Sequence, residues 1–360
     1  MGKKYVLSRK IVALLCIIVL MLQFEAPINP VFAKEENKIN SIVCNYLVVN
    51  NFDMTKNYYI SQEFTINGNY KNPSDGHLHF VFNDEGCIGE LLISDRGDSF
   101  FREQCESVTD LKKKNEAFCI FTNNLNVYIL TGEKQILLWG NPEDIVTDTK
   151  LSLLRMQNIV LDSVYVDTKY KNTKSVVDIE YDLNVPYIAN VASPDTGAGL
   201  CWAASTLSML KYKSLASGYN TAVSLYNYYK NYYIPTETAP YPPGTGTDIV
   251  ALFSLFGVSV THGAWGGMTF SYTQSLLDPN NEKPILAGLS GYLGSNLVGH
   301  TVVISGYKIF SIEGLNYYYY YKLRDPNNSN IVTVSVNPTA TNFSYYTGGV
   351  LFDTWEEYFY

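Results

Sequence analysis

Cys201 lies where an apolar helical pattern begins, and no further cysteine follows it. The next residues have good helix propensity and place an apolar stripe at helical spacing, consisting of Ala203, Ala204, Leu207 and Leu210. Two cations follow at positions 211 and 213, so the pattern predicts a helix over residues 201–213. A thiol in the first turn of a helix lies near unpaired backbone N–H groups and the positive end of the helix dipole, and both favour the reactive thiolate. Cys201 is therefore a candidate nucleophile, and the alternative is a buried structural cysteine.

His300 is the candidate base for that thiol. It opens the apolar run 300–307, in which His300, Val302 and Ile304 share one side of a predicted strand. Imidazole titrates near neutral pH, and a thiolate–imidazolium pair would stabilise the ionised sulfur. The alternative is a core histidine at the start of a strand. His262 is a rival base, but it belongs to a glycine-rich stretch, residues 262–267, which predicts a surface loop.

A catalytic imidazole needs an acceptor for its second nitrogen. Asp325 follows a predicted strand over residues 315–323, and pairing of that strand with the His300 strand would bring the carboxylate to the same edge. Asp-Pro is also a common turn, so Asp325 alone would be ambiguous. Asn327 is the alternative acceptor.

The N-terminal residues predict export. Basic residues at positions 3, 4, 9 and 10 precede an apolar run over residues 11–22, and small residues at 31 and 33 fit a signal-peptidase site. Residues 1–33 are therefore expected to be a signal peptide cleaved after Ala33, which leaves a secreted or cell-surface protein without a stable membrane anchor, because the apolar run is too short to span a bilayer.

Cysteine usage separates Cys201 from the other thiols. After signal cleavage, Cys44, Cys87, Cys105 and Cys119 precede residue 120, and they could pair in three ways in an oxidising environment. Cys201 is then left over. An unpaired cysteine in an exported protein is a liability unless its reactivity is used, which favours the role of a nucleophile.

Composition favours a globular protein in two parts. The 360 residues are 46% apolar and 17% charged, with a formal net charge of −8, which argues against a nucleic-acid partner because clustered cations are needed to bind phosphates. Residues 34–182 predict a β-rich region with a hairpin over 78–82 and 88–94, further strands at 117–122, 127–130 and 135–139, and a polar linker near 167–182. Residues 183–360 predict three more helices, over 222–233, 249–256 and 269–277, followed by strands at 284–289, 300–310, 315–323 and 331–336, an α+β order.

The motifs around these residues resemble the papain-like cysteine peptidases, closest to the secreted bacterial staphopain type and the C39-like domain type. The resemblance covers residues 183–350 and rests on Leu200-Cys201-Trp202-Ala203-Ala204, on residues 299–307 and on Asp325-Pro326. It implies a two-lobed α+β fold with a helical lobe and an antiparallel β lobe, Cys201 as nucleophile, His300 as base, and no cofactor or metal. It also implies that residues 34–182 are an inhibitory propeptide built as a small β-rich prodomain.

Two positions depart from the family pattern. A glutamine usually precedes the cysteine and donates into the oxyanion hole, whereas this chain has Asp195, whose carboxylate would repel an oxyanion. Asn190 is the nearest upstream amide and the candidate donor. The second departure is Asp325 where papain has Asn, although the C39-like pattern has Asp.

The expected function is a secreted cysteine endopeptidase made as a zymogen, acting on protein or peptide substrates through Cys201, His300 and Asp325. Cleavage within residues 169–182 is expected to release the active domain. Two alternatives remain open: a catalytically inactive module that binds peptides, and an acyltransferase of transglutaminase type that uses the same three residues.

Overall fold

The computed structural model describes residues 31–65, 76–94, 99–103, 118–123, 126–131, 134–139, 161–166, 177–191, 199–238, 241–293, 295–312, 316–347 and 350–360. The chain forms two compact units, residues 1–42 and residues 43–360. The first unit is described only for part of one helix, α2 (Val31–Val49), which continues into the second unit. None of the helices within the described ranges combines the length and hydrophobicity that a bilayer crossing requires.

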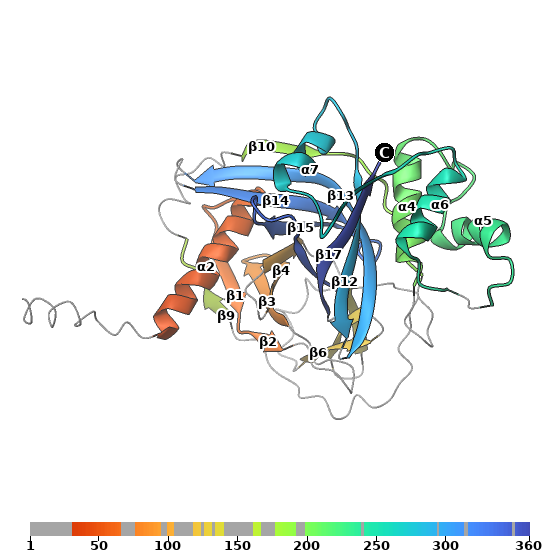
Figure 1. Ribbon diagram of the computed structural model, residues 1–360. Helices are drawn as coiled ribbons and strands as arrows, with labels where there is room; N and C mark the ends of the chain where they lie inside the picture. The colour runs from red at the N-terminus through yellow and green to blue at the C-terminus, as the bar shows by residue number, and fades with distance from the viewer. Residues whose placement is uncertain are drawn as a thin grey trace, which may run out of the picture. The chain divides into compact units, whose positions relative to one another are not determined.

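Fourteen strands of the second unit form one sheet (Figure 1). Its main path is β11-β17-β12-β13-β14-β15-β5-β4-β3-β1-β9, and β10, β16 and β2 pair with β13, β17 and β3. The strands are β1 (Tyr58–Ser61), β2 (Phe64–Thr65), β3 (Gly76–Asn83), β4 (Gly86–Ser94), β5 (Ser99–Glu103), β9 (Leu161–Ser163), β10 (Val177–Asp182), β11 (Thr261–Trp265), β12 (Ile285–Leu293), β13 (Asn296–Ile312), β14 (Asn316–Arg324), β15 (Ile331–Val336), β16 (Ser344–Thr347) and β17 (Val350–Phe359). A separate three-stranded sheet consists of β6 (Phe118–Asn123), β7 (Asn126–Thr131) and β8 (Lys134–Trp139).

Four helices come from the C-terminal half: α4 (Cys201–Tyr212), α5 (Ala222–Tyr233), α6 (Gly246–Ser254) and α7 (Phe270–Leu277). Helix α4 packs against β13 and β12 on one side and against α5 and α6 on the other (Figure 1). Its residues from Trp202 to Leu210 are all buried, because alanines and small hydroxyl residues let the helix approach the strands closely. The nucleophile candidate therefore begins a helix that is enclosed along most of its length.

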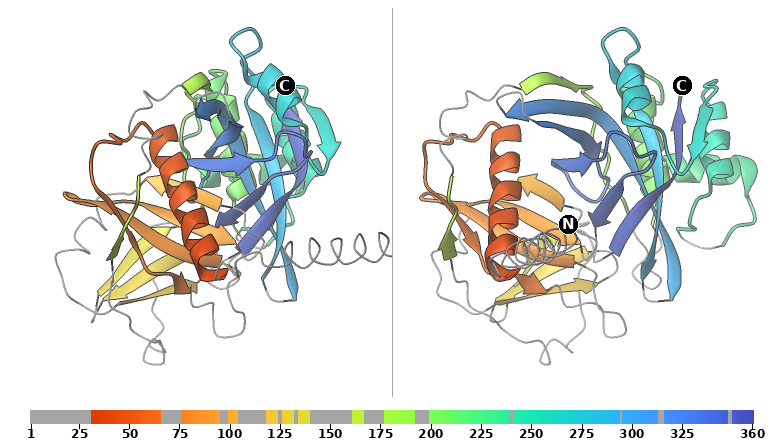
Figure 2. Two further views of the ribbon diagram at one scale, coloured as in Figure 1. Left: turned by 90° about the vertical axis from the view of Figure 1, so that its left-hand side faces the viewer. Right: turned by 60° about the vertical axis from the view of Figure 1, so that its left-hand side comes forward.

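The prediction of a two-lobed α+β fold preceded by a separate β-rich prodomain is wrong. The described residues form mainly one large antiparallel sheet with a few short helices. Strand β5 of the N-terminal region pairs with β15 of the C-terminal region, with Phe101 opposite Thr333. Strands from both regions therefore belong to one sheet, and Figure 2 shows the N-terminal strands in orange beside the C-terminal strands in blue. Their buried apolar side chains also belong to one core cluster. Alternating hydrophobicity identifies strands, but it does not show which edges pair.

Individual elements were predicted more accurately than their assembly. The hairpin of β3 and β4, the individual strands β6, β7 and β8, the four predicted C-terminal helices and strands β12 to β15 are confirmed near their expected positions. Helix α6 begins three residues earlier than predicted. Thr245 is its N-cap, and the Asp248 carboxylate accepts the backbone N–H of Thr245 to complete a capping box. His262 lies in β11 and not in a loop.

The predicted linker falls only partly within the described residues. Residues 167–176 lie outside them, whereas residues 177–182 form β10 and pair with β13. The predicted signal cleavage after Ala33 falls within α2, three residues from its start. Cleavage there would shorten α2 but leave residues 34–49 of the helix in the chain.

Candidate active site

Cys201 is the first residue of α4 and is half-buried. Leu200 is the N-cap and provides no side-chain hydrogen bond to the first turn. The N-terminal N–H groups of a helix have no partner within the helix, and they point toward the end where the thiol is attached. Helix geometry alone therefore supplies part of the positive potential that a thiolate needs.

Trp202 fixes the start of this helix. Its ring makes edge-on contacts with Tyr226, at 6.2 Å between centroids, and with Tyr229, at 5.4 Å. Its indole N–H donates to the Pro242 carbonyl oxygen at 3.3 Å. A Cβ at Gly244 would lie 2.4 Å from the indole, so only glycine allows the loop to pass over the ring. Trp202, the residue next to Cys201, is thus held by two tyrosine rings, by a hydrogen bond and by the loop at Gly244.

The helix and the His300 strand are joined beside the thiol. The hydroxyl of Ser205 donates to the Thr301 carbonyl oxygen at 2.9 Å. His300 and Thr301 are the two residues whose hydrogen-bonding groups and charge influence the ionisation of the Cys201 thiol. Burial alone would raise the pKa of the Cys201 thiol, but hydrogen bonding and the charge of His300, together with the Thr301 contacts, outweigh burial and hold the pKa below its usual value.

Asp325 holds the other side of the imidazole. The Nε2 atom of His300 lies 2.8 Å from Oδ1 of Asp325, and both side chains are almost fully buried. Because Nε2 is engaged there, Nδ1 is the nitrogen available to Cys201, and it is buried without a hydrogen bond to any described residue. Burial alone would lower the pKa of His300, but the Asp325 carboxylate and the Cys201 thiolate raise it well above its ordinary value.

The Asp325 carboxylate accepts hydrogen bonds at both oxygens. Besides His300, Oδ1 receives the backbone N–H of Asn327 at 2.8 Å. Oδ2 receives the hydroxyls of Tyr345, at 2.7 Å, and Thr347, at 3.3 Å. Burial opposes ionisation of the carboxylate, but His300 and these donors lower the pKa of Asp325, so it remains charged.

Tyr345 and Thr347 were not among the predicted site residues. Both belong to β16, which pairs with β17 as a hairpin. The alternation of Phe343, Tyr345 and Thr347 before a Gly-Gly pair is a signal for such a hairpin and could have revealed the strand. On β17, Phe352 places its ring 5.7 Å from the His300 ring. The β16-β17 hairpin thus contacts both Asp325 and His300.

The two predicted asparagines bond to each other. The side-chain amide of Asn190 donates to Oδ1 of Asn327 at 2.9 Å, and the Asn190 backbone N–H donates to the Pro326 carbonyl oxygen. The structure therefore brings Asp325, and not the Asn327 side chain, to His300. Asn190 also lies against Gly199, where a Cβ would be 2.8 Å from its amide nitrogen, so it is close in the fold to the residues before Cys201. Asp195 lies outside the described residues.

The remaining titratable candidates are located elsewhere. His262 has Glu356 and Tyr358 as neighbours, with 3.9 Å between its Nε2 and a Glu356 oxygen. Cys87 is buried on β4, and burial raises the pKa of its thiol far above the usual value. The thiol of Cys44 lies 3.9 Å from the Tyr165 carbonyl oxygen, Cys105 lies outside the described residues, and Cys119 lies on β6. Among the described residues no cluster of His, Cys, Asp and Glu has the arrangement of a metal site.

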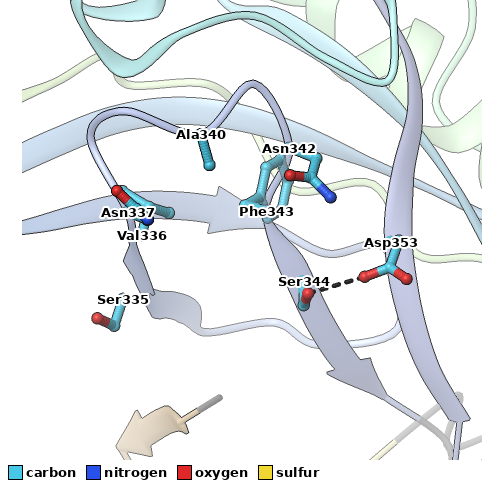
Figure 3. A pocket seen from close by; sticks show the side chains of 8 residues that line it. All are labelled: Ser335, Val336, Asn337, Ala340, Asn342, Phe343, Ser344 and Asp353. Carbon is cyan, nitrogen blue, oxygen red and sulfur yellow. Dashed lines mark hydrogen bonds between the residues drawn. The ribbon is translucent and has the colours of Figure 1, made fainter. Parts of the chain in front are cut away.

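A hollow of about 300 Å³ is lined by residues of β15, of the segment that follows β15, of β16 and of β17 (Figure 3). Ser344 and Asp353 line it and are joined by a hydrogen bond of 2.8 Å. Cys201, His300 and Asp325 are not among the residues that line it. The hollow is therefore not the site at which Cys201 would meet a substrate.

Comparison with known proteins does not identify a family. The chain matches no protein-family model, and a search of curated proteins finds no significant match. The chemistry of the site therefore rests on its geometry.

Proposed function

We propose that this protein is a cysteine peptidase in which Cys201 is the nucleophile, His300 the acid and base, and Asp325 the residue that orients the imidazole. One observation carries the proposal: the first turn of α4, which bears Cys201, is bonded to β13 beside His300, and Asp325 occupies the far nitrogen of that imidazole. This arrangement lowers the pKa of Cys201 and raises that of His300. Opposite shifts of this kind favour a thiolate–imidazolium pair at neutral pH. The order Cys, His, Asp along the chain agrees with the resemblance to papain-like peptidases.

In the first half of the reaction, the Cys201 thiolate attacks the carbonyl carbon of a peptide bond. The carbonyl π electrons move to oxygen, and backbone N–H groups at the start of α4 are suited to stabilise the oxyanion. Asn190 remains the predicted side-chain donor. The imidazolium of His300 then gives its proton to the leaving amine, the C–N bond breaks, and a thioester forms at Cys201.

In the second half, neutral His300 removes a proton from water as the water attacks the thioester. Collapse of the tetrahedral intermediate releases the carboxylic acid product and restores the thiolate and the imidazolium. Asp325 keeps the ring in position throughout and stabilises the imidazolium without taking its proton.

Hydrolysis of an unfolded protein substrate by the purified chain tests the proposal. We expect Cys201→Ala to abolish cleavage and His300→Ala to reduce it by about 1,000-fold or more. Cys87→Ala, which alters another buried thiol, is the matched control and should retain activity. Full activity in Cys201→Ala would refute the proposal. Transfer of the acyl group mainly to an added amine, with little hydrolysis, would indicate an acyltransferase.

We further propose that the protein is secreted as a precursor, with cleavage after Ala33 and a second cleavage within residues 167–176. The pairing of β10 with β13 argues against cleavage at residues 177–182, because a protease needs an extended strand that it can bind. The pairing of β5 with β15 would keep the two products associated, so cleavage alone would not remove an inhibitor. N-terminal sequencing of secreted protein tests this, and a single N-terminus at residue 34 in fully active protein would contradict it.

A further inference from the structure

The oxygen of Asp325 that does not face His300 is held from β16. Tyr345 donates to it at 2.7 Å, and Thr347 donates at the longer distance of 3.3 Å. Tyr345 is 3% exposed and Asp325 is fully buried, so water does not compete for this hydrogen bond. A hydrogen bond to a charged group in such surroundings is stronger than an ordinary one.

Strand β5 of the N-terminal half reaches the same tyrosine. In the β15–β5 pairing, Phe100 lies opposite Val334 and Arg102 lies opposite Val332. Phe100 and Arg102 are two residues apart, so they point to the same face of the sheet. The Phe100 ring contacts Tyr345 edge-on, with 6.2 Å between the ring centroids. The face of β5 that carries Arg102 is therefore the one turned to Tyr345.

Arg102 is itself fixed by a buried carboxylate. Its Nη2 lies 2.5 Å from Oε2 of Glu90, its cross-strand neighbour on β4, and the two side chains are 6% and 0% exposed. Removing two charges from water is costly, and a buried ion pair often adds little net stability. The Arg102–Glu90 ion pair lies on the face of β5 that is turned to Tyr345, and we infer that it has a role other than stability.

The charge of Arg102 acts on the tyrosine. Burial and the Asp325 carboxylate raise the pKa of Tyr345 well above its usual value, and Arg102 opposes them. The hydroxyl consequently keeps its proton and remains a donor. A positive charge on the face of β5 that is turned to Tyr345 makes the O–H group more polar and a better donor to Asp325.

We propose that Tyr345 is a positioning residue for the Cys201–His300–Asp325 site, and that Arg102, fixed by Glu90, strengthens its hydrogen bond to Asp325. We call Tyr345, Arg102 and Glu90 the Asp325 support. The inference rests on the proposed function. It assigns the N-terminal strands a supporting role in the active site, in addition to any effect that they have on substrate access.

The expected consequence is a wider pH range for the thiolate–imidazolium pair. A better-held Asp325 carboxylate stabilises the imidazolium, and the imidazolium stabilises the thiolate. Loss of the support should therefore raise the pKa of Cys201 and lower that of His300. Among the described residues, Tyr187 also responds to Asp325. Burial and the Asp325 charge raise its pKa to about 12, so it does not titrate in the same range.

The pH dependence of Cys201 alkylation by iodoacetamide measures this effect without knowledge of the substrate, when peptide mapping follows Cys201 alone. We expect Tyr345→Phe to raise the thiolate pKa by about half to one unit, which is an alkylation rate about three- to tenfold lower on the acidic limb. Tyr59→Phe is the matched control, because it removes another tyrosine hydroxyl that donates to an aspartate, Asp84, at the surface. It should leave the pKa unchanged.

A double variant separates the charge of Arg102 from the hydroxyl. Glu90→Leu/Arg102→Met removes both partners of the ion pair, a change that buried pairs often tolerate, and Glu90→Gln/Arg102→Gln is the substitute if the first variant is not recovered folded. We expect a smaller shift in the same direction, and no further shift when Tyr345→Phe is added, because both changes act on the same hydrogen bond.

Two results would overturn the Asp325 support. One is an unchanged Cys201 pKa in Tyr345→Phe at an unaltered melting temperature. The other is an ion-pair variant whose shift is the same with and without the Tyr345 hydroxyl. A Cys201 thiol of the original chain that titrates like an ordinary cysteine, near pH 8.5, would instead overturn the proposed function, and the support with it.

Discussion

Replacement of Asp325 by Asn removes the charge that the buried imidazolium faces, with little change in shape. All four groups around Asp325 are donors: His300 at Nε2, the Asn327 N–H, and the hydroxyls of Tyr345 and Thr347. An amide oxygen at Oδ1 can still accept from His300 and Asn327, while hydroxyls can rotate to accept from the new NH₂ group. The variant should therefore fold.

The expected loss of activity in Asp325→Asn follows from the loss of one charge-assisted hydrogen bond between residue 325 and His300. Such a bond contributes about 1.5–3 kcal/mol, which corresponds to a loss of about 10- to 150-fold in kcat/KM at neutral pH. The same free energy lowers the pKa of His300 by about one to two units. Since the imidazolium must remain protonated for the first half of the reaction, the alkaline limb of the pH–rate profile should move to lower pH by that amount.

Stability should change in a defined pH window. The pKa of Asp325 is depressed in the fold, so its charge adds stability above its unfolded value of about 4, and this is lost as the pH falls through the folded value. The pKa of His300 is raised, so its contribution is complete below about 6.5 and is lost as the pH rises through the folded value. Asp325→Asn should therefore be most destabilising, relative to the original chain, between about pH 4 and 6.5.

The assay is kcat/KM against pH for Asp325→Asn and Asn327→Ala, with denaturant unfolding of each variant at the same pH values. Asn327→Ala is the matched comparison, because its side chain bonds Asn190 and not His300, and it should retain the position of the alkaline limb. An alkaline limb that is unchanged in Asp325→Asn and displaced in Asn327→Ala would refute the assignment of Asp325.

Two further predictions concern the elements that hold the site. Gly244→Ala would force a methyl group against Trp202 and should reduce the free energy of unfolding by about 1–3 kcal/mol. Gly218→Ala is the control, because no heavy atom lies within 4 Å of its new Cβ, and it should cost less than about 1 kcal/mol. Denaturant titration measures both values. The buried ammonium of Lys308 donates to the Val49 carbonyl oxygen at the end of α2 and lies 3.0 Å from a Glu180 carboxylate oxygen. Lys308→Met removes both interactions and should lower the melting temperature by several degrees. Lys56→Met, at an exposed ion pair, should change it by less than about two degrees. These assignments would be contradicted if Gly244→Ala and Gly218→Ala changed the free energy of unfolding equally, or if Lys308→Met and Lys56→Met changed the melting temperature equally.

The sequence predicted the elements that carry Cys201 and His300 but not the surroundings of these residues. A cysteine at a helix start and a histidine on a strand are local patterns, and both are found where they were expected. Asp325 was predicted because it follows the strand paired with that of His300, and β13 and β14 do pair. Tyr345 comes from a hairpin that had not been predicted, so its contact with Asp325 could not be anticipated.

The overall fold was missed for a different reason. Strand β5 was not predicted at all, and its pairing with β15 joins residues far apart in sequence. Each strand can be recognised from its own alternation, but pairing depends on which edges are free in the folded chain. The family resemblance covered only residues 183–350. It implied a small β-rich prodomain for residues 34–182, but not the pairing of the N-terminal strands with the C-terminal sheet.

The central claim is that the Cys201 thiolate becomes acylated during turnover. Mass spectrometry of the chain, quenched in acid while it hydrolyses an activated peptide ester, tests this directly. We predict an added acyl group on the peptide that contains Cys201, accumulating to a lower level or more slowly in His300→Ala. An acyl group on a different residue, or turnover without any adduct at Cys201, would contradict the claim.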